Sequence, residues 1–483
     1  MYQSFSDIIF KPFPHPTPPG FNFLIKLQMT LGGLNELNLR LFSLFASLLS
    51  LILFLQFLKN IGSNSFVLTM AYAFFAFSEN LINYAAIVKP YTNDVFMALI
   101  LWLTFYPFLK RKNISFRDMI MLALVGSAAV WFSFPTIFIL AGAGSVFFIS
   151  RLREKDFKNL TRLGVIISAW LFNFMVLYHK LFSSLTESTE LDYFWTRYFP
   201  SSSLSWQNLT IILEKTIAAF NNPGGLTLPY IAFFVALIGF FNLRRKDATK
   251  AWFLISPLLA AFLAFLLKKY PFHERLILFL LPVLYLMVAE GIDCLHSKGK
   301  KLQVASLLLC ALFLILPLER SRQSVLKPDL KDDIRPVMQQ LVKYLDTSDV
   351  VCVNMASQWS FWYYLQSLNS GITYQKIGLL ADQLVRYDSS TYGLMTVVEF
   401  RLTPEGKFQE VHFPGLNLKI EENNTDVFPR NSRTWFLFSR ASKELEEFIL
   451  QYLDKIGRKT AGLKSQGSSL YLYDLSLPRD TAP

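Results

Sequence analysis

Residues 37–58 are LNLRLFSLFASLLSLILFLQFL, an apolar run in which Arg40 is the one charged side chain. A helix needs about 20 apolar residues to cross the hydrocarbon core of a bilayer. Because lipid cannot satisfy free peptide groups, such a segment must be helical. Similar runs recur along the first two-thirds of the chain. The sequence therefore predicts a polytopic α-helical membrane protein.

The composition of the whole chain agrees with this prediction. The 483 residues are 53% hydrophobic and 17% charged, with a mean hydropathy of +0.35, whereas soluble domains carry about 25% charge. The net charge of +12 could indicate nucleic-acid binding, but the basic residues lie in short clusters between the apolar runs. Loops that set membrane topology show this pattern. We therefore expect the lipid bilayer, and no nucleic acid, as a partner.

About ten transmembrane helices are expected. Proline in WFSFP (131–135) separates the fourth from the fifth, and the short apolar segment 20–33 is predicted to be an interfacial helix. The approximate spans are 37–58, 64–80, 92–109, 118–132, 135–150, 162–181, 227–243, 250–267, 275–292 and 302–318.

The loops alternate in charge along the chain. Short basic loops lie at 109–117, 151–162, 244–250 and 296–301, and the positive-inside rule places them in the cytoplasm. The opposite loops and the tail are then external, in a multi-pass protein of the inner (cytoplasmic) membrane. This divides the chain into an external loop with an interfacial helix (1–36), a transmembrane domain (37–318) and an external soluble domain (319–483).

The tail differs from the rest because its charge rises and short β-type runs appear. Strands are predicted at 349–355, 434–440 and 468–475, with amphipathic helices at 334–346 and 442–457 between them. Strands alternating with helices are typical of an α/β domain. We therefore expect a C-terminal external α/β domain.

A first polar turn, VKPYTNDV (88–95), lies between two predicted spans. Pro90 can end the preceding helix, which leaves Lys89 and Tyr91 at the edge of the bilayer. Asp94 falls at the start of the next helix, where a carboxylate can cap free N–H groups. The alternative is functional: Lys89 contacts a phosphate, while Asp94 orients a sugar or an acceptor hydroxyl.

A second polar turn, KKYPFHER (268–275), brings Lys268, Lys269, His273 and Arg275 to another external boundary. Such a cluster can hold an anionic lipid headgroup, with arginine forming a bidentate pair to phosphate. Ordinary interfacial anchoring is the alternative. Because a basic cluster on the external side runs against the topology bias, the binding interpretation is favoured.

Weaker candidates lie elsewhere in the external loops. His15 in the proline-rich segment 11–21 is a candidate ligand of the substrate or of a metal, although a single histidine more often binds neither. The acidic residues of LTESTELDY (185–193) could bind a divalent metal or simply be solvated. No CxxC pair occurs among the three cysteines. We assign no metal ligand and no certain cofactor. The sequence leaves open whether the protein needs a divalent metal.

Three motifs occur in order: KPYTND (89–94), YPFHER (270–275), and a tail with DDIRPV (332–337) and then DVVCVNMASQWSFWYY (349–364). Together they make the chain resemble the multispanning glycosyltransferases of the GT-C fold, specifically the family 39 and protein O-mannosyltransferase-like branch of bacterial membranes. The resemblance covers nearly the whole chain.

This resemblance implies an inverting transfer of a sugar from a polyprenyl-phosphate carrier to a lipid, glycan or protein acceptor on the external face. The arginine and the lysines would stabilise the negative charge of the leaving phosphate, and an aspartate, Asp94 here, would be the general base. The implied substrate-binding residues are Lys89, Tyr91, Lys269, Tyr270 and Arg275.

The start of the chain departs from the family pattern, which has one more span and then an external loop with the acidic base. SFSDIIFKPFPHPTPPGF (4–21) resembles the end of that loop, and Asp7 does not match the motif position. We therefore expect a truncated start or a catalytically impaired, glycan-binding relative as one alternative. A lipid flippase or transporter is another. Transporters place ionisable groups at the bilayer midplane, whereas here the polar groups gather at one interface.

Overall fold

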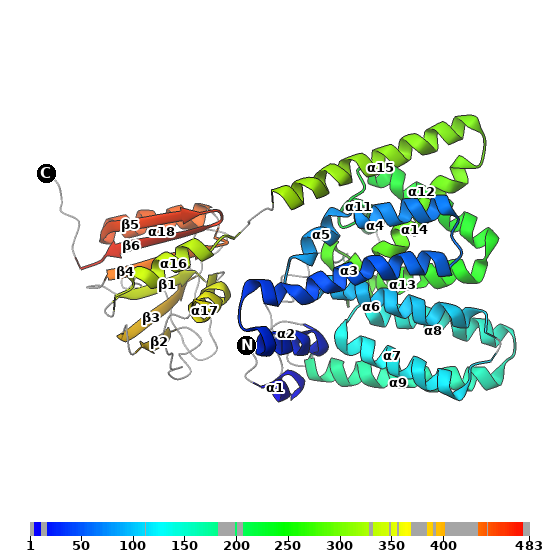
Figure 1. Ribbon diagram of the computed structural model, residues 1–483, viewed down its shortest axis with the longest axis horizontal. Helices are drawn as coiled ribbons and strands as arrows, with labels where there is room; N and C mark the ends of the chain where they lie inside the picture. The colour runs from blue at the N-terminus through cyan, green and yellow to red at the C-terminus, as the bar shows by residue number, and fades with distance from the viewer. Residues whose placement is uncertain are drawn as a thin grey trace. The chain divides into compact units, whose positions relative to one another are not determined.

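The computed structural model describes residues 4–10, 17–111, 113–181, 199, 206–327, 332–346, 349–354, 357–368, 384–389, 393–400, 433–441 and 443–476. The chain divides into two compact units, Met1–Pro328 and Asp329–Pro483. The first unit is helical and the second contains a six-stranded sheet (Figure 1).

The long helices of the first unit run roughly side by side, so their connections gather at two ends (Figure 1). The helices are α1 (Phe5–Phe10), α2 (Pro19–Gly32), α3 (Glu36–Asn60), α4 (Ser65–Ala76), α5 (Glu79–Ala85), α6 (Tyr91–Phe105), η1 (Tyr106–Leu109), α7 (Phe116–Phe132), α8 (Thr136–Arg153), α9 (Phe157–Leu181), α11 (Trp206–Asn221), α12 (Pro229–Lys246), α13 (Ala248–Leu266), η2 (Glu274–Leu280), α14 (Leu281–His296) and α15 (Lys300–Leu326).

In the part of the chain that is described, seven helical segments are long and apolar enough to cross a membrane. The pair α4 and α5, bent by 48°, makes an eighth if it counts as one span. The other two expected spans are helical as well, but α7 has only 17 residues and α12 ends in Arg244, Arg245 and Lys246. The predicted membrane-protein fold is confirmed, with seven to eight clear spans where about ten were expected.

Two local features depart from the expected pattern, each for a physical reason. The span expected at 64–80 is broken at Phe77, and the Ser321 hydroxyl donates to the Phe77 carbonyl exposed by the break (2.7 Å). The interfacial helix expected at 20–33 begins at Pro19, inside the proline-rich segment 11–21. Proline is tolerated in the first helical turn because its missing N–H would have no partner there.

Helices α12 and α14 approach each other closely through two glycines. A Cβ atom at Gly239 would lie 1.9 Å from Met287 O, and one at Gly291 would lie 1.9 Å from Val235 O. Both contacts are far shorter than any real carbon–oxygen contact. Small residues at both positions therefore let the two backbones touch, as in many membrane helix pairs.

The basic loops meet at one end of the helical unit, which we call the basic end (connections near 60–64, 110–115, 154–156, 247 and 297–299). There Lys250 Nζ donates to Ile61 O, Arg151 donates to Arg111 O, and Lys110 pairs with Asp247 (3.6 Å). The opposite end, which we call the motif end, holds the connections near 86–90, 133–135, 222–228 and 267–273. The side of the membrane that each end faces stays a prediction.

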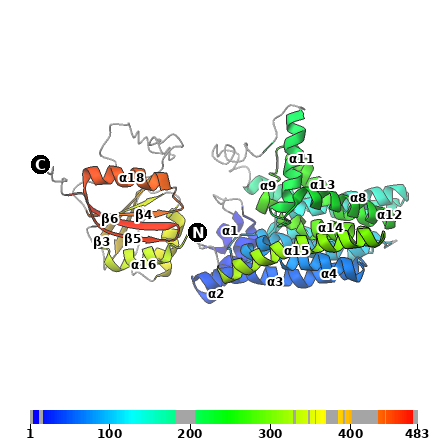
Figure 2. The same cartoon turned by 90° about the horizontal axis from the view of Figure 1, so that it is seen from above.

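The second unit is a six-stranded sheet with helices on both faces (Figure 2). Its strand order is β2-β3-β1-β4-β6-β5, in which β1 runs parallel to β3 and β4 and the other pairs are antiparallel. The elements are β1 (Val350–Asn354), β2 (Leu384–Ser389), β3 (Gly393–Phe400), β4 (Arg433–Ser439), β5 (Arg458–Ser465) and β6 (Ser468–Asp474), with α16 (Arg335–Tyr344), α17 (Gln358–Ser367) and α18 (Lys443–Ile456).

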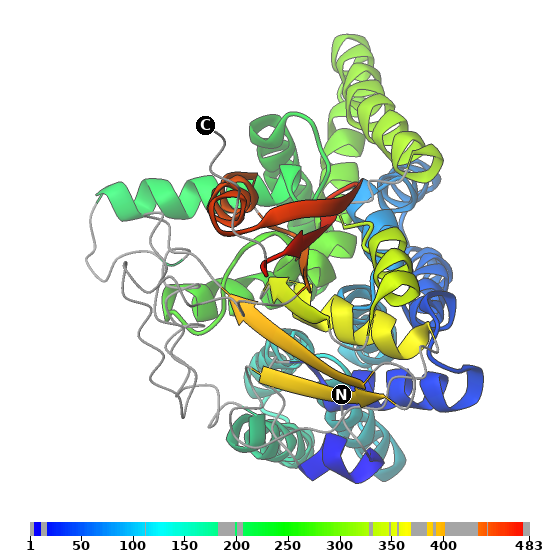
Figure 3. The ribbon, with the colours of Figure 1, turned by 90° about the vertical axis from the view of Figure 1, so that its left-hand side faces the viewer.

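Alternating side chains give this sheet two separate cores. Val351, Val353 and Leu437 pack with α16 and α17, whereas Phe436 and Phe438 pack with α18 on the other face. The strands twist progressively across the sheet (Figure 3). The predicted α/β domain is confirmed, and its placement outside the cytoplasm stays a prediction.

Candidate functional site

Helix α6 begins directly after Pro90 and carries Asp94 in its first turn. The Asp94 backbone N–H donates to Pro90 O (2.8 Å), and no side chain caps the helix. The Asp94 side chain is therefore not the helix cap that its position allowed. It is buried, and Oδ1 makes no hydrogen bond with any described residue.

The turn between α13 and η2 presents the second motif. The Tyr270 hydroxyl donates to Leu276 O (2.7 Å), which closes the turn on itself. Glu274 has φ of 38°, a left-handed conformation that side chains other than glycine adopt at a cost. This strained residue comes directly before Arg275, whose side chain is exposed. An internal hydrogen bond therefore holds the turn in place, and the backbone conformation of Glu274 sets the direction in which the Arg275 side chain leaves the turn.

The two motifs, far apart in the sequence, come together at the motif end. The Arg275 guanidinium lies over the Tyr91 ring, 5.7 Å from its centroid. Burial raises the pKa of the Tyr270 hydroxyl well above its usual value, and nearby Asp94 and Tyr91 add to this shift. Arg275, Tyr91, Asp94 and Tyr270 therefore form one cluster, in which a cation, two phenols and a buried carboxyl group are neighbours.

The end of α7 completes the polar lining of this cluster. The Asn93 amide donates to Phe132 O, which ties α6 to the break between α7 and α8. The Ser133 hydroxyl at this break lies beside the Asp94 carboxyl group. Like the Thr92 hydroxyl, it is buried, and neither hydroxyl has a hydrogen bond of good geometry with a described group. A buried polar group without a partner is costly, so these atoms are candidates for contact with a ligand or water.

The other predicted residues lie at the rim of the cluster or outside the described residues. Lys89 and Lys269 are exposed, on the two turns that carry the motifs. His15 and the acidic stretch 185–193 lie outside the described residues. Within the described ranges, no group of three or more His, Cys, Asp or Glu side chains could hold a metal ion.

Two residues of the cluster were missed by the sequence reasoning. The Tyr84 ring packs edge-on against Tyr91, with 5.0 Å between the ring centroids. Ser133 lies in WFSFP, which we interpreted only as a helix break. Ser133 belongs to a connection at the motif end, so the alternation of loops contained a signal for it, whereas Tyr84 lies near the end of α5. Their contacts with the motifs depend on how the helices pack, which the loops alone do not give.

Comparisons with known proteins connect this arrangement to solved structures. No protein-family model matches the sequence, and no curated protein sequence matches it significantly. Crystal structures of ArnT from Cupriavidus metallidurans, in the apo state and bound to undecaprenyl phosphate, are similar to this chain. In both cases the TM-score is 0.52, the identity is 10%, and the match covers 96% of this chain and 89% of that chain. The fold is GT-C. At this identity, the likeness supports the fold that the motifs implied and leaves the narrower family 39 assignment a prediction.

Proposed function

We propose that this chain is an integral-membrane glycosyltransferase that transfers a sugar, with inversion, from a polyprenyl-phosphate carrier to an acceptor on the external face. One observation carries the proposal: Arg275, Tyr91, Tyr270 and the buried Asp94 meet at one end of a GT-C bundle. The likeness to ArnT, solved with undecaprenyl phosphate, supports a polyprenyl-phosphate partner.

The cluster suits a donor whose phosphate becomes the leaving group. When the bond between sugar and phosphate breaks, negative charge grows on the phosphate oxygens. The Arg275 guanidinium can stabilise that charge with two parallel N–H donors, and Lys89 and Lys269 add positive charge at the rim. Preorganised cations of this kind usually supply a large part of the rate enhancement.

Asp94 is proposed as the general base. Its buried carboxyl group has an oxygen without a hydrogen-bond partner among the described residues, so it can accept the proton of an acceptor hydroxyl. Tyr91 and Tyr270 border the same space, where they can orient the sugar. The mannosyl-type family 39 specificity implied by the motifs belongs to this proposal, as do the acceptor and the inner-membrane location.

The placement of buried charge favours an enzyme over a flippase or transporter. Among the described residues of the helical unit, the buried charged side chains are Asp94, Arg151, Lys250 and Glu290. Asp94 lies in the first turn of α6 and the other three lie near the basic end, where they have partners. Transport pathways instead place ionisable groups at the membrane midplane.

The experiment uses the full chain in lipid nanodiscs with undecaprenyl phosphates that carry radiolabelled hexoses or pentoses, and with a mixture of lipid, glycan and protein acceptors. We expect the wild type to release undecaprenyl phosphate, and we expect Arg275→Ala and Lys89→Ala to abolish release without loss of folded protein. Unchanged turnover in both variants would remove the site assignment. If undecaprenyl phosphate is released from none of the donors and lipid moves across the bilayer, the result would favour a transporter instead.

A further inference from the structure

A small pocket lies between α3, the broken span formed by α4 and α5, and the start of α6. Its volume is about 50 Å³. The residues that line it come from these four helices: Ser47, Ser50, Leu51, Phe75, Ala76, Leu81, Ile82, Thr92 and Val95. The pocket therefore lies at the point where the span bends by 48°. Irregular backbone at membrane depth occurs where it is buried in protein or lines a cavity.

The Thr92 hydroxyl is the group in this pocket that lacks a partner. Thr92 is 2% exposed, and its Oγ1 has no well-formed hydrogen bond among the described residues. The nearby Ser50 hydroxyl is also buried and donates to Ala46 O (2.6 Å), so its oxygen is still able to accept. A buried hydroxyl without a partner is costly. A ligand that supplies a hydrogen-bonding group would therefore be stabilised here.

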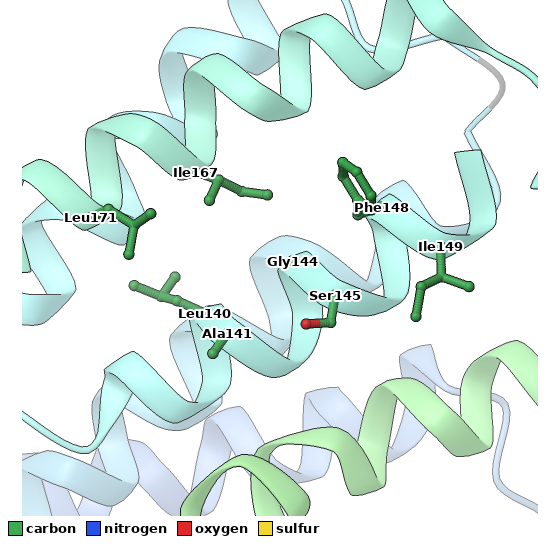
Figure 4. Close-up of a pocket in the computed structure, with 8 residues that line it drawn as sticks. All are labelled: Leu140, Ala141, Gly144, Ser145, Phe148, Ile149, Ile167 and Leu171. Atoms are coloured by element: carbon green, nitrogen blue, oxygen red, sulfur yellow. The ribbon is translucent and has the colours of Figure 1, made fainter. Parts of the chain in front are cut away.

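The larger groove between α8 and α9 lacks this feature (Figure 4). Its volume is about 450 Å³, and Ser145, its one polar lining side chain, is exposed. All the residues that line this groove are described, and none of them has a buried side-chain polar atom without a hydrogen bond. The groove therefore does not select a ligand by hydrogen bonding, whereas the smaller pocket does.

The pocket is separate from the polar cluster, although Thr92 and Asp94 are only two residues apart. Two residues turn an α-helix by about 200°, so the two side chains leave α6 on different sides. Thr92 lines the pocket with residues of α3, α4 and α5, whereas Asp94 lies near Ser133 and Tyr270. A molecule bound in the pocket would therefore not be the phosphate group of the proposed donor.

The lining of the pocket favours a neutral ligand with one polar end. Six of its nine residues are apolar, three carry hydroxyl groups and none is charged, and burying an unpaired ion costs far more than burying a neutral hydroxyl. A buried water needs roughly 10–15 Å³ and about three polar partners. Several waters would therefore be needed to fill the pocket, and they would need more hydrogen bonds than three hydroxyls supply. A single hydroxyl on an apolar stem matches both the polar and the apolar lining.

The pocket opens towards the lipid. Ser47 is partly exposed, and the neighbouring Leu44 and Leu48 are 43% and 48% exposed. Because α3 is long and apolar enough to span the membrane, these side chains meet lipid chains and not water. A ligand would therefore enter from the bilayer.

We propose that this pocket binds the hydroxyl group of a neutral lipid alcohol, with Thr92 as its hydrogen-bonding partner. The bound alcohol would connect α3 and α6 at the break between α4 and α5. This inference does not depend on the proposed transfer reaction, so its failure would leave that proposal unchanged.

The test compares three probes with the same chain length: 1-dodecanol, dodecane, which lacks the hydroxyl, and dodecylamine, which is cationic at neutral pH. Thermal unfolding of the whole protein in detergent is measured at increasing mole fractions of each probe. Thr92→Val removes the hydroxyl with little change in shape, and Ser47→Leu fills the pocket on a face that already carries leucines. Thr216→Val is the matched control, because the Thr216 hydroxyl donates to Ile212 O on α11 and lies outside the pocket.

We expect dodecanol to raise the melting temperature of the wild type and of Thr216→Val, and dodecane to raise neither. Thr92→Val should need about five times more dodecanol for half of the rise, because one hydrogen bond to the ligand is lost. Ser47→Leu should show no rise, because the leucine side chain occupies the pocket.

Four outcomes would overturn the inference. Equal responses of the wild type to dodecanol and dodecane would show that the hydroxyl is not recognised. Equal responses of all four proteins to dodecanol would show that the alcohol acts through the detergent. A response to dodecylamine as large as that to dodecanol would contradict a neutral site. No response of the wild type to dodecanol, together with a loss of stability in Thr92→Val, would assign the pocket to water.

Discussion

The two ends of the helical unit handle polar groups in opposite ways. At the basic end, charged side chains have partners: Lys246 pairs with the buried Glu290 (3.2 Å), Arg111 pairs with Asp118 (2.9 Å) and Lys250 donates to Ile61 O. At the motif end, Thr92 Oγ1, Asp94 Oδ1 and Ser133 Oγ are buried without a well-formed hydrogen bond among the described residues. Ser63 at the basic end and Trp102 Nε1 farther along α6 are exceptions to this division.

The difference between partnered and unpartnered polar groups suggests a structural role for the basic end and a binding role for the motif end. Paired charges near a helix end hold connections together and need no ligand. Unpaired buried oxygens cost stability, so their grouping beside an exposed arginine indicates a site that is completed by what it binds. The following substitutions test whether the two ends differ in this way.

Arg275→Ala should have the largest effect. Removing a cation that stabilises a leaving phosphate typically costs a factor of about a hundred to a thousand in rate, measured here as release of undecaprenyl phosphate from a labelled donor. Arg275→Lys should recover only part of this, because lysine lacks the paired donors. Arg322→Ala, which removes an exposed arginine paired with Glu319, should change the rate little. Equal rates for Arg275→Ala and wild type would show that the motif end contributes no more to transfer than the basic end does.

Asp94→Asn should have the second-largest effect on the transfer rate. Losing a general base lowers the rate by about a hundredfold, while thermal stability should stay the same or rise because a buried unpaired carboxyl group is removed. The matched control at the basic end is Asp118→Asn. Asp118 forms a capping box with Ser115 at the start of α7, so this change should lower the melting temperature and leave the rate unchanged. A destabilised but fully active Asp94→Asn protein would show that Asp94 is structural.

Glu290→Ala should lower the free energy of unfolding by about 2 kcal/mol, because it removes the buried carboxylate that accepts a hydrogen bond from the half-exposed Lys246. Asn242 loses a hydrogen-bond acceptor in the same step (3.3 Å). Thermal unfolding in detergent measures the loss. Transfer kinetics at a temperature where the variant is folded should match the wild type. Glu154→Ala, which removes an exposed partner of Arg151, should cost less than about 1 kcal/mol. A kinetic defect in Glu290→Ala would contradict the purely structural view of the basic end.

The smallest effect is expected for Thr92→Val. The change removes a buried hydroxyl that has no partner among the described residues, so stability should rise by up to about 1 kcal/mol. Thr216→Val should act in the opposite direction, because the Thr216 hydroxyl donates to Ile212 O (2.9 Å). The melting temperatures of the two variants, each compared with the wild type, show whether the two stability changes have opposite signs. A clear loss of stability in Thr92→Val would mean that the hydroxyl is satisfied in the membrane, for example by water.

Much of this fold follows from apolar periodicity. Each of the ten expected spans is helical, because segments such as 37–58 have no other way to satisfy their peptide groups in lipid. The strands β1, β4 and β6 were also expected, since they are dense in β-branched and aromatic residues. The strands β2 and β5 were not, because Arg, Asp, Lys and Gly interrupt their patterns. The strand β3, GLMTVVEF, was missed although its residues favour a strand. The bend after α4 was missed because the Ser321 hydroxyl that satisfies it comes from α15, late in the chain.

The candidate site was predictable in part. Charge alternation placed KPYTND and YPFHER at the same end, and the structure brings Tyr91 and Arg275 into contact. No residue pattern indicated that Tyr84 would pack against Tyr91, or that Asp94 would be buried instead of capping its helix. Both depend on side-chain packing between helices, which a pattern of residue types does not specify. The roles of Lys89, Lys269 and His15 stay predictions.

The left-handed backbone at Glu274 has a practical consequence for protein engineering. Glycine would adopt the same φ of 38° without the steric penalty of a side chain. Glu274→Gly should therefore relax this turn and could raise the melting point, yet it would also let the following peptide sample more orientations. The Arg275 guanidinium would then be held less firmly beside Tyr91, so under the proposed function a thermostable variant obtained at this position would be a slower catalyst.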